Sequence, residues 1–147
     1  LSKILWNRYA VQERKTQMAN VVFFSFRESD RETVLTIKGR AVNPNYSNLN
    51  FRVKDLLKRW DTEDTSVIRQ AISKAMSGTS RTIVFVGQQT YLSRWVREEV
   101  KMTIENGKPV YAIRLKETNG QKPKVLDDHG ITLYAWSEER LQDLATR

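Results

Sequence analysis

Two runs of apolar and β-branched residues stand out along the chain, at residues 21–26 and 82–86. Both are almost free of polar residues, and neither shows the strict alternation of a strand with one face in water. Continuous apolar runs of this length are typical of strands buried on both faces of a parallel sheet. Three weaker runs predict further strands, at residues 49–53, 110–115 and 131–135.

Helical spacing of apolar residues fills most of the chain between these runs. Acidic residues at the start of a segment, a polar capping residue and a glycine after the end mark the boundaries. Residues 1–19 have mixed helical spacing and are predicted to form an N-terminal helical arm. Further helices are predicted over residues 31–42, over residues 64–77, from Ser93 to the stop at Gly107, and from Ser137 onward.

Strand and helix patterns alternate five times, which predicts the α/β class with a five-stranded parallel sheet between two layers of helices, a three-layer sandwich. The expected strand order is the flavodoxin-like 2-1-3-4-5. In that order the switch point lies between strands one and three, and ligands bind at the carboxyl ends of the strands there. The loops concerned are residues 26–30 and 87–93. The polar segment 117–124 is expected to be a surface excursion.

At 147 residues the chain is long enough for one domain with a substantial core. Its formal charge of +8 favours an anionic partner, such as nucleic acid or a phosphate-bearing molecule, or else reflects the solvated surface of a basic protein. Interleaved aromatic and basic residues on one strand face are almost lacking, so nucleic acid is not the favoured partner. The densest basic zone comprises Lys38, Arg40, Arg52, Lys54, Lys58 and Arg59.

Several other kinds of site are excluded or disfavoured by the sequence. The chain has no cysteine and one histidine, so disulfides, thiolate chemistry and a multi-histidine metal site are excluded. The acids before residue 65 are explained by the dipole of the helix that follows them, and no metal site is expected. No Walker or dinucleotide glycine motif is present, and no apolar run reaches the length of a membrane helix. We therefore expect a soluble, cytoplasmic domain without membrane partners.

The helix after Ser93 carries the candidate chemistry. Trp95 and Glu99, four residues apart, lie on one face of it, whereas Val96 and Val100 belong to a separate apolar stripe. Glu99 has no basic residue four positions before or after it. A carboxylate beside an indole near the switch point is a candidate functional group, and the alternative is a surface glutamate on a charged helix.

The neighbouring carboxylate has a simpler interpretation. Glu98 follows Arg94 by four residues, a spacing that predicts an exposed ion pair on the helix surface. Glu98 is therefore expected to have no functional role.

Residues 20–116 resemble the TIR-like family whose best-known members are the ThsB proteins of the Thoeris antiphage system. The most specific part of the resemblance is the S-x-W-V-x-x-E element that contains Ser93, Trp95, Val96 and Glu99. The resemblance implies a TIR-like domain over residues 20–147. It also implies cleavage of NAD, as substrate and not as cofactor, between nicotinamide and ribose, with release of an ADP-ribose-derived signal for an effector protein.

By the same resemblance Glu99 corresponds to the catalytic glutamate of the family. The residues implied to bind the substrate lie on the same helix start and on the two switch-point loops. These residues are Phe26, Arg27, Asp30, Thr90, Ser93 and Trp95. Assembly into a homo-oligomer is a further expectation, and we also expect Arg27 and Glu99 to form opposite walls of one crevice.

A single carboxylate is chemically sufficient for this reaction. In ordinary glycoside hydrolysis one acid protonates the leaving oxygen while a second carboxylate attacks or activates water. Nicotinamide already carries a positive charge in NAD and leaves as a neutral molecule, so no acid is needed. What remains is a cation on the ribose, which a fixed carboxylate stabilises. The family also contains non-catalytic interaction modules, which remain the alternative function.

Overall fold

The computed structural model describes residues 21–57, 59 and 61–147. The predicted arm over residues 1–19 lies outside the described residues. The described part forms a five-stranded parallel sheet in the order β2-β1-β3-β4-β5, which confirms the predicted α/β sandwich and its strand order. The strands are β1 (Val21–Ser25), β2 (Arg52–Asp55), β3 (Arg81–Val86), β4 (Val110–Arg114) and β5 (Leu133–Tyr134).

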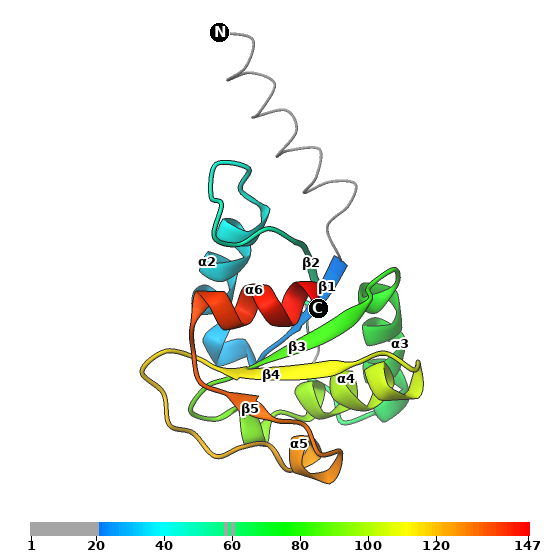
Figure 1. The fold of residues 1–147 in the computed structure, drawn as a ribbon. Coiled ribbons are helices and arrows are strands. Elements are labelled where there is room, and N and C mark those ends of the chain that lie inside the picture. The colour runs from blue at the N-terminus through cyan, green and yellow to red at the C-terminus, as the bar shows by residue number, and fades with distance from the viewer. Residues whose placement is uncertain (1–20, 58, 60) are drawn as a thin grey trace, which may run out of the picture.

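Helices cover both faces of this sheet (Figure 1). The α-helices are α2 (Arg31–Val42), α3 (Thr65–Met76), α4 (Arg94–Glu105), α5 (Lys124–Asp128) and α6 (Glu138–Thr146). Two short 3₁₀ helices, η2 (Glu28–Asp30) and η3 (Thr90–Leu92), follow β1 and β3 at the carboxyl edge of the sheet. None of the helices in the described part of the chain has the length and apolar character that a membrane crossing requires.

Alternate residues of the central strands divide the core between the two faces. Phe24, Ile83 and Phe85 pack with the buried sides of α2 and α6. On the opposite face Val84 packs with α4 and α5, and Phe23 packs with α3. All six residues of β3 are buried, as the unbroken apolar run predicts for the central strand of a parallel sheet.

The structure differs from the prediction at one strand and contains one helix that was not predicted. The predicted strand over residues 49–53 is displaced, because Leu49 and Phe51 are buried in the core as loop residues and the strand itself is Arg52–Asp55. The helix α5 was not predicted, since its five residues offer too short a pattern, yet Val125 and Leu126 are buried against α4.

The segment after β4 is only in part a surface excursion, since Glu117, Asn119, Gln121 and Lys124 are exposed but Gly120 and Pro123 are buried. Gly120 is buried, and a Cβ atom at this position would lie 2.2 Å from the Gly87 carbonyl oxygen. The backbone N–H of Asn119 also donates a hydrogen bond to the side chain of Gln88 (2.5 Å). The segment therefore folds back over the end of β3 and helps to fix the loop that follows it.

Candidate active site

Glu99 lies in α4 at the carboxyl end of β1, and it has no exposed surface (0%). The helix begins after Ser93, whose Oγ accepts a hydrogen bond from the Val96 backbone N–H (3.1 Å). Val96 and Val100 are buried against the sheet and fix the rotation of the helix. Because Glu99 is adjacent to Val100 on the buried side, its carboxylate reaches the end of β1.

Ser25, the last residue of β1, contacts the Glu99 carboxylate directly. Its Oγ donates a hydrogen bond to Glu99 Oε1 at 2.8 Å, and both side chains are buried. The bond connects two elements that are 74 residues apart in the chain. It holds one carboxylate oxygen in a defined position at the switch point of the sheet.

Arg59 covers the same carboxylate from the segment between β2 and α3. Its Nη2 lies 3.5 Å from Glu99 Oε1, and the Arg59 side chain is only 8% exposed. Its Nη1 donates a hydrogen bond to the backbone carbonyl of Phe26 (2.6 Å). The guanidinium also lies 5.1 Å from the ring centroid of Phe26 and 6.0 Å from that of Trp95. Glu99 thus contacts Ser25 and Arg59, and two aromatic rings lie beside the Arg59 guanidinium.

The enclosed ion pair is incompletely satisfied. Among the described residues, Glu99 Oε2 and the Nε and Nη2 atoms of Arg59 are buried without a hydrogen-bond partner. Burial raises the pKa of Glu99 to about 7, against the opposing effects of the Arg59 charge and the Ser25 hydrogen bond, and Asp55 adds to the rise. A buried carboxylate that is only partly satisfied and titrates near neutrality is typical of functional sites.

The two switch-point loops contact each other at the carboxyl edge of the sheet. Arg27 donates a hydrogen bond from its Nη1 to the side-chain oxygen of Gln89, which joins the loop after β1 to the loop after β3. Asp30 packs against Gly87 so closely that a Cβ at Gly87 would lie 2.4 Å from Asp30 Oδ2. Burial raises the pKa of Asp30, and the nearby Arg27 charge opposes that rise.

Glu99 has no exposed surface in this conformation, and the crevice between Arg27 and Glu99 stays a prediction. Phe26 and Trp95 lie next to Arg59 and so belong to the surroundings of Glu99. Thr90 is fully buried, and its Oγ1 accepts a hydrogen bond from the Gly87 backbone N–H (2.8 Å). Thr90 therefore shapes the loop after β3, and the role of these residues in binding a substrate stays a prediction.

The predicted exposed ion pair between Arg94 and Glu98 is wrong. Glu98 is buried (5% exposed) and accepts a hydrogen bond from Arg69 Nε of α3 at 3.0 Å. Arg94 instead donates a hydrogen bond to Thr65 Oγ1 at 2.9 Å. The helical spacing of four residues made the local pair plausible, but the packing of α3 on α4 offers Glu98 a partner that local spacing cannot reveal.

Sequence reasoning missed Ser25 and Arg59. Ser25 was a weak signal, as the only polar residue in an otherwise apolar strand that ends at the switch point. Arg59 was noticed only as part of a basic zone. The described residues contain no group of three or more His, Cys, Asp or Glu side chains that is arranged to hold a metal ion. The side chains that contact the Glu99 carboxylate are thus the Ser25 hydroxyl and the Arg59 guanidinium.

Comparisons with known proteins identify the family and support the fold. Residues 23–120 match the family model of the TIR-like domain of the Thoeris protein ThsB. A Bacillus cereus (strain MSX-D12) protein named "Putative cyclic ADP-D-ribose synthase ThsB1" is 32% identical over 104 residues, which are 67% of this chain and 53% of that protein. The chain thus spans about half the length of this curated relative.

A solved structure gives independent support for the fold. The crystal structure of the TIR domain of the Toll-related receptor TRR-2 from Hydra magnipapillata aligns with a TM-score of 0.51, over 84% of this chain and 90% of that chain. At 16% sequence identity this similarity concerns the fold alone.

The raised pKa of Glu99 predicts a specific dependence of stability on pH. The folded protein holds the Glu99 proton up to about pH 7, whereas an unfolded glutamate releases it near its ordinary value of 4.5. Stability therefore falls as the pH rises between these values. Relative to Glu99→Gln, the wild type should lose on the order of 2 kcal/mol of unfolding free energy between about pH 5 and pH 8, measured by urea denaturation. Parallel curves for the two proteins would contradict the raised pKa.

Proposed function

Because the chain belongs to the family of TIR-like domains of the Thoeris protein ThsB, we propose that it cleaves NAD at the bond between nicotinamide and ribose and releases an ADP-ribose-derived product that acts as a signal in antiphage defence. The observation that supports this proposal most strongly is the geometry of Glu99. Its carboxylate lies at the switch point of the sheet, accepts a hydrogen bond from Ser25, and pairs with Arg59, which in turn lies beside Trp95.

The proposed chemistry needs a negative charge that is fixed before the reaction begins. The bond between nicotinamide nitrogen and the ribose anomeric carbon breaks, and its electron pair neutralises the pyridinium ring. A positive charge then develops on the ribose. The Glu99 carboxylate stabilises that charge at short range, and the Ser25 hydrogen bond of 2.8 Å keeps the carboxylate in place.

The ribose cation has two fates in this scheme. Attack by water, with loss of a proton to solvent, gives ADP-ribose, whereas attack by a nucleophile within the same molecule gives a cyclic product. The name of the Bacillus cereus relative favours the cyclic outcome. We further propose that a separate effector protein responds to the product, and that NAD is consumed as substrate.

Arg59 has two effects on this chemistry. Its charge opposes the rise in the pKa of Glu99 and so favours the ionised carboxylate. Its side chain also encloses Glu99, so a ribose reaches the carboxylate only after Arg59 moves away from Phe26 and Trp95. The described conformation is therefore the closed form of the proposed site.

The full burial of Glu99 is also the observation that favours the alternative, a non-catalytic TIR-like interaction module. In such a protein Arg59 would stay paired with Glu99, and the ion pair would serve only to fix the position of α4. The two functions differ in one simple assay. A catalytic protein produces free nicotinamide from NAD, whereas the interaction module leaves NAD intact.

Incubation of the purified protein with NAD, followed by separation of the products by mass, tests the proposal. We expect nicotinamide and an ADP-ribose-derived product from the wild type. Glu99→Gln keeps the shape of the side chain but removes its charge, and should lower the rate by roughly 10²-fold or more. Full activity of Glu99→Gln would show that Glu99 is not the catalytic carboxylate.

Glu98→Gln is the matched control, because it removes the charge of a second buried glutamate on the same helix. The loss of the ion pair between Glu98 and Arg69 should lower the free energy of unfolding by about 1–2 kcal/mol. Activity per folded molecule should remain within about twofold, an effect smaller than one hydrogen bond is worth. Equal loss of activity in both variants would mean that the position of α4, and not the charge of Glu99, limits the reaction.

Ser25→Ala tests the positioning role of the hydroxyl. Because the Ser25 hydrogen bond lowers the pKa of Glu99, its removal should shift the rising limb of the kcat/KM profile from near pH 7 to higher pH. The plateau rate should also fall about tenfold, the expected effect of one hydrogen bond to a charged group. Ser80→Ala, at the opposite edge of the sheet, should change neither. An unshifted profile in Ser25→Ala would contradict the role of Ser25.

Arg59→Ala tests whether the guanidinium restricts access to Glu99. At about pH 8.5 the carboxylate is ionised in the wild type, so the loss of the Arg59 charge matters least there. Removal of the cover should then raise kcat/KM for NAD several-fold. A decrease under these conditions would instead place Arg59 among the groups that bind the substrate.

A further inference from the structure

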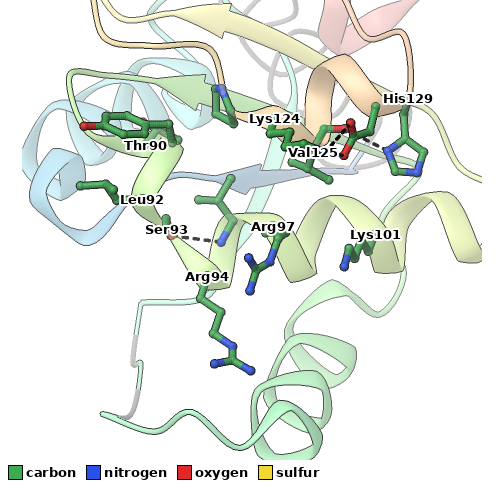
Figure 2. Close-up of a pocket in the computed structure, with 13 residues that line it drawn as sticks. Thr90, Leu92, Ser93, Arg94, Arg97, Lys101, Lys124, Val125 and His129 are labelled. Carbon is green, nitrogen blue, oxygen red and sulfur yellow. Dashed lines mark hydrogen bonds and ion pairs between the residues drawn. The ribbon is translucent and has the colours of Figure 1, made fainter.

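A cavity lies between α4 and α5, and Glu99 is not among the residues that line it (Figure 2). Its volume is about 440 Å³, and its walls come from the turn before α4, the outer face of α4 and the start of α5. A volume of this size is within the range that holds one drug-sized ligand, about 300–1,000 Å³. The cavity is therefore large enough for a mononucleotide.

Positive charge dominates the cavity walls. Four cationic side chains and one acidic side chain line it, and the acid, Asp128, is held by Lys124 at 3.0 and 3.1 Å. Arg94 is directed away from the cavity toward α3 in Figure 2 and bonds Thr65. Arg97 and Lys101 are the two cations that remain for a ligand.

Arg97 and Lys101 lie one helical turn apart on α4 and point to the same side of it (Figure 2). Within the part of the chain that the structure describes, neither forms an ion pair within 4.0 Å. The nearby Glu105 is attracted to Lys101, but its two oxygens accept hydrogen bonds from Arg69 at 2.8 and 3.0 Å. Like charges four residues apart on a helix repel each other, and a bound anion would remove that repulsion.

An apolar rim completes the cavity on the side of η3. Tyr91 and Leu92 are 42% and 58% exposed, although they are large apolar side chains. They line the cavity together with the buried Val125 of α5. An exposed aromatic ring next to free cations is suited to a ligand that has both a flat base and phosphate groups, since aromatic rings stack on nucleobases.

We propose that the cavity between α4 and α5 binds a nucleoside phosphate, with the phosphates at Arg97 and Lys101 and the base at Tyr91. Arg97 is two residues from Glu99, a rotation of about 200° around the helix, so a ligand here lies on the face opposite Glu99. Two residues that the family resemblance implies bind NAD, Thr90 and Ser93, also line this cavity, but the proposed contacts are made by Arg97, Lys101 and Tyr91 and do not include Glu99. A nucleic acid strand is less well matched, because the cavity is bounded and provides two free cations instead of a row of them.

Titration calorimetry with ADP as the probe tests the proposal in the purified protein. We expect one ADP per chain in the wild type and the same affinity in Glu99→Gln, which places the ligand away from that carboxylate. ADP should bind more tightly than either inorganic pyrophosphate or adenosine, since it engages both the cations and the rim. Loss of ADP binding in Glu99→Gln, or equal binding of pyrophosphate and ADP, would overturn the assignment.

A pair of double variants separates this site from the general positive charge of the protein. Arg97→Gln with Lys101→Gln should weaken ADP at least tenfold. Lys74→Gln with Lys108→Gln removes the same charge outside the cavity and should leave the affinity unchanged. Equal weakening by both pairs, or tighter binding of a short single-stranded oligonucleotide than of ADP, would overturn the proposal in favour of a diffuse basic surface. Thermal melts of all variants confirm that the fold is retained.

Discussion

The burial of the Glu99 carboxylate is the constraint on which the rest of the site depends. It is satisfied by one hydrogen bond from Ser25 and one ion pair with Arg59, and its second oxygen has no partner among the described residues. Desolvation outweighs both favourable contacts and raises the pKa of Glu99 to about 7. The packing of α4 on the sheet must therefore supply the free energy that keeps this group inside, through Val96, Val100 and the Ser93 cap.

The same constraint connects the charge of the site to its accessibility. Arg59 is the nearest cation and also the nearest cover, so its removal changes both the charge balance and the exposure of Glu99. A carboxylate that is protonated in the closed form near neutrality would become ionised when the cover leaves and water or substrate enters. The movement of Arg59 away from the site and the ionisation of Glu99 would then occur in one event. The proposed NAD cleavage requires that event, whereas a non-catalytic module would not.

Much of the fold could be predicted from the sequence because it depends on local periodicity. The unbroken apolar runs at β1 and β3 and the helical stripes between them predict the alternation of strands and helices, and the flavodoxin-like order 2-1-3-4-5 expected for that alternation is the observed one. Local spacing also indicated Glu99 as a candidate functional residue, since no basic residue lies four positions before or after it. The displaced β2 shows the limit of this reasoning. The apolar residues Leu49 and Phe51 pack in the core as loop residues and are not part of the strand.

The polar contacts of the site could not be predicted in the same way. Ser25 and Glu99 are 74 residues apart, and Arg69 and Glu98 are 29 apart. Such pairs depend on how α3, α4 and β1 pack, for which helical spacing carries no information. Glu98 is an example. Helical spacing predicts an ion pair with Arg94, whereas the partner of Glu98 in the structure is Arg69 on α3. The resemblance to a family identified Glu99 but neither Ser25 nor Arg59.

The most direct test of the account is a titration of the Glu99 carboxyl carbon by ¹³C NMR, with the signal assigned by its absence in Glu99→Gln. The account predicts a midpoint near pH 7 in the free protein. It also predicts that the signal moves when NAD is added, because the substrate must displace Arg59 and approach the carboxylate. A signal that titrates near the ordinary value of 4.5 and does not respond to NAD would contradict both the buried state of Glu99 and its proposed role.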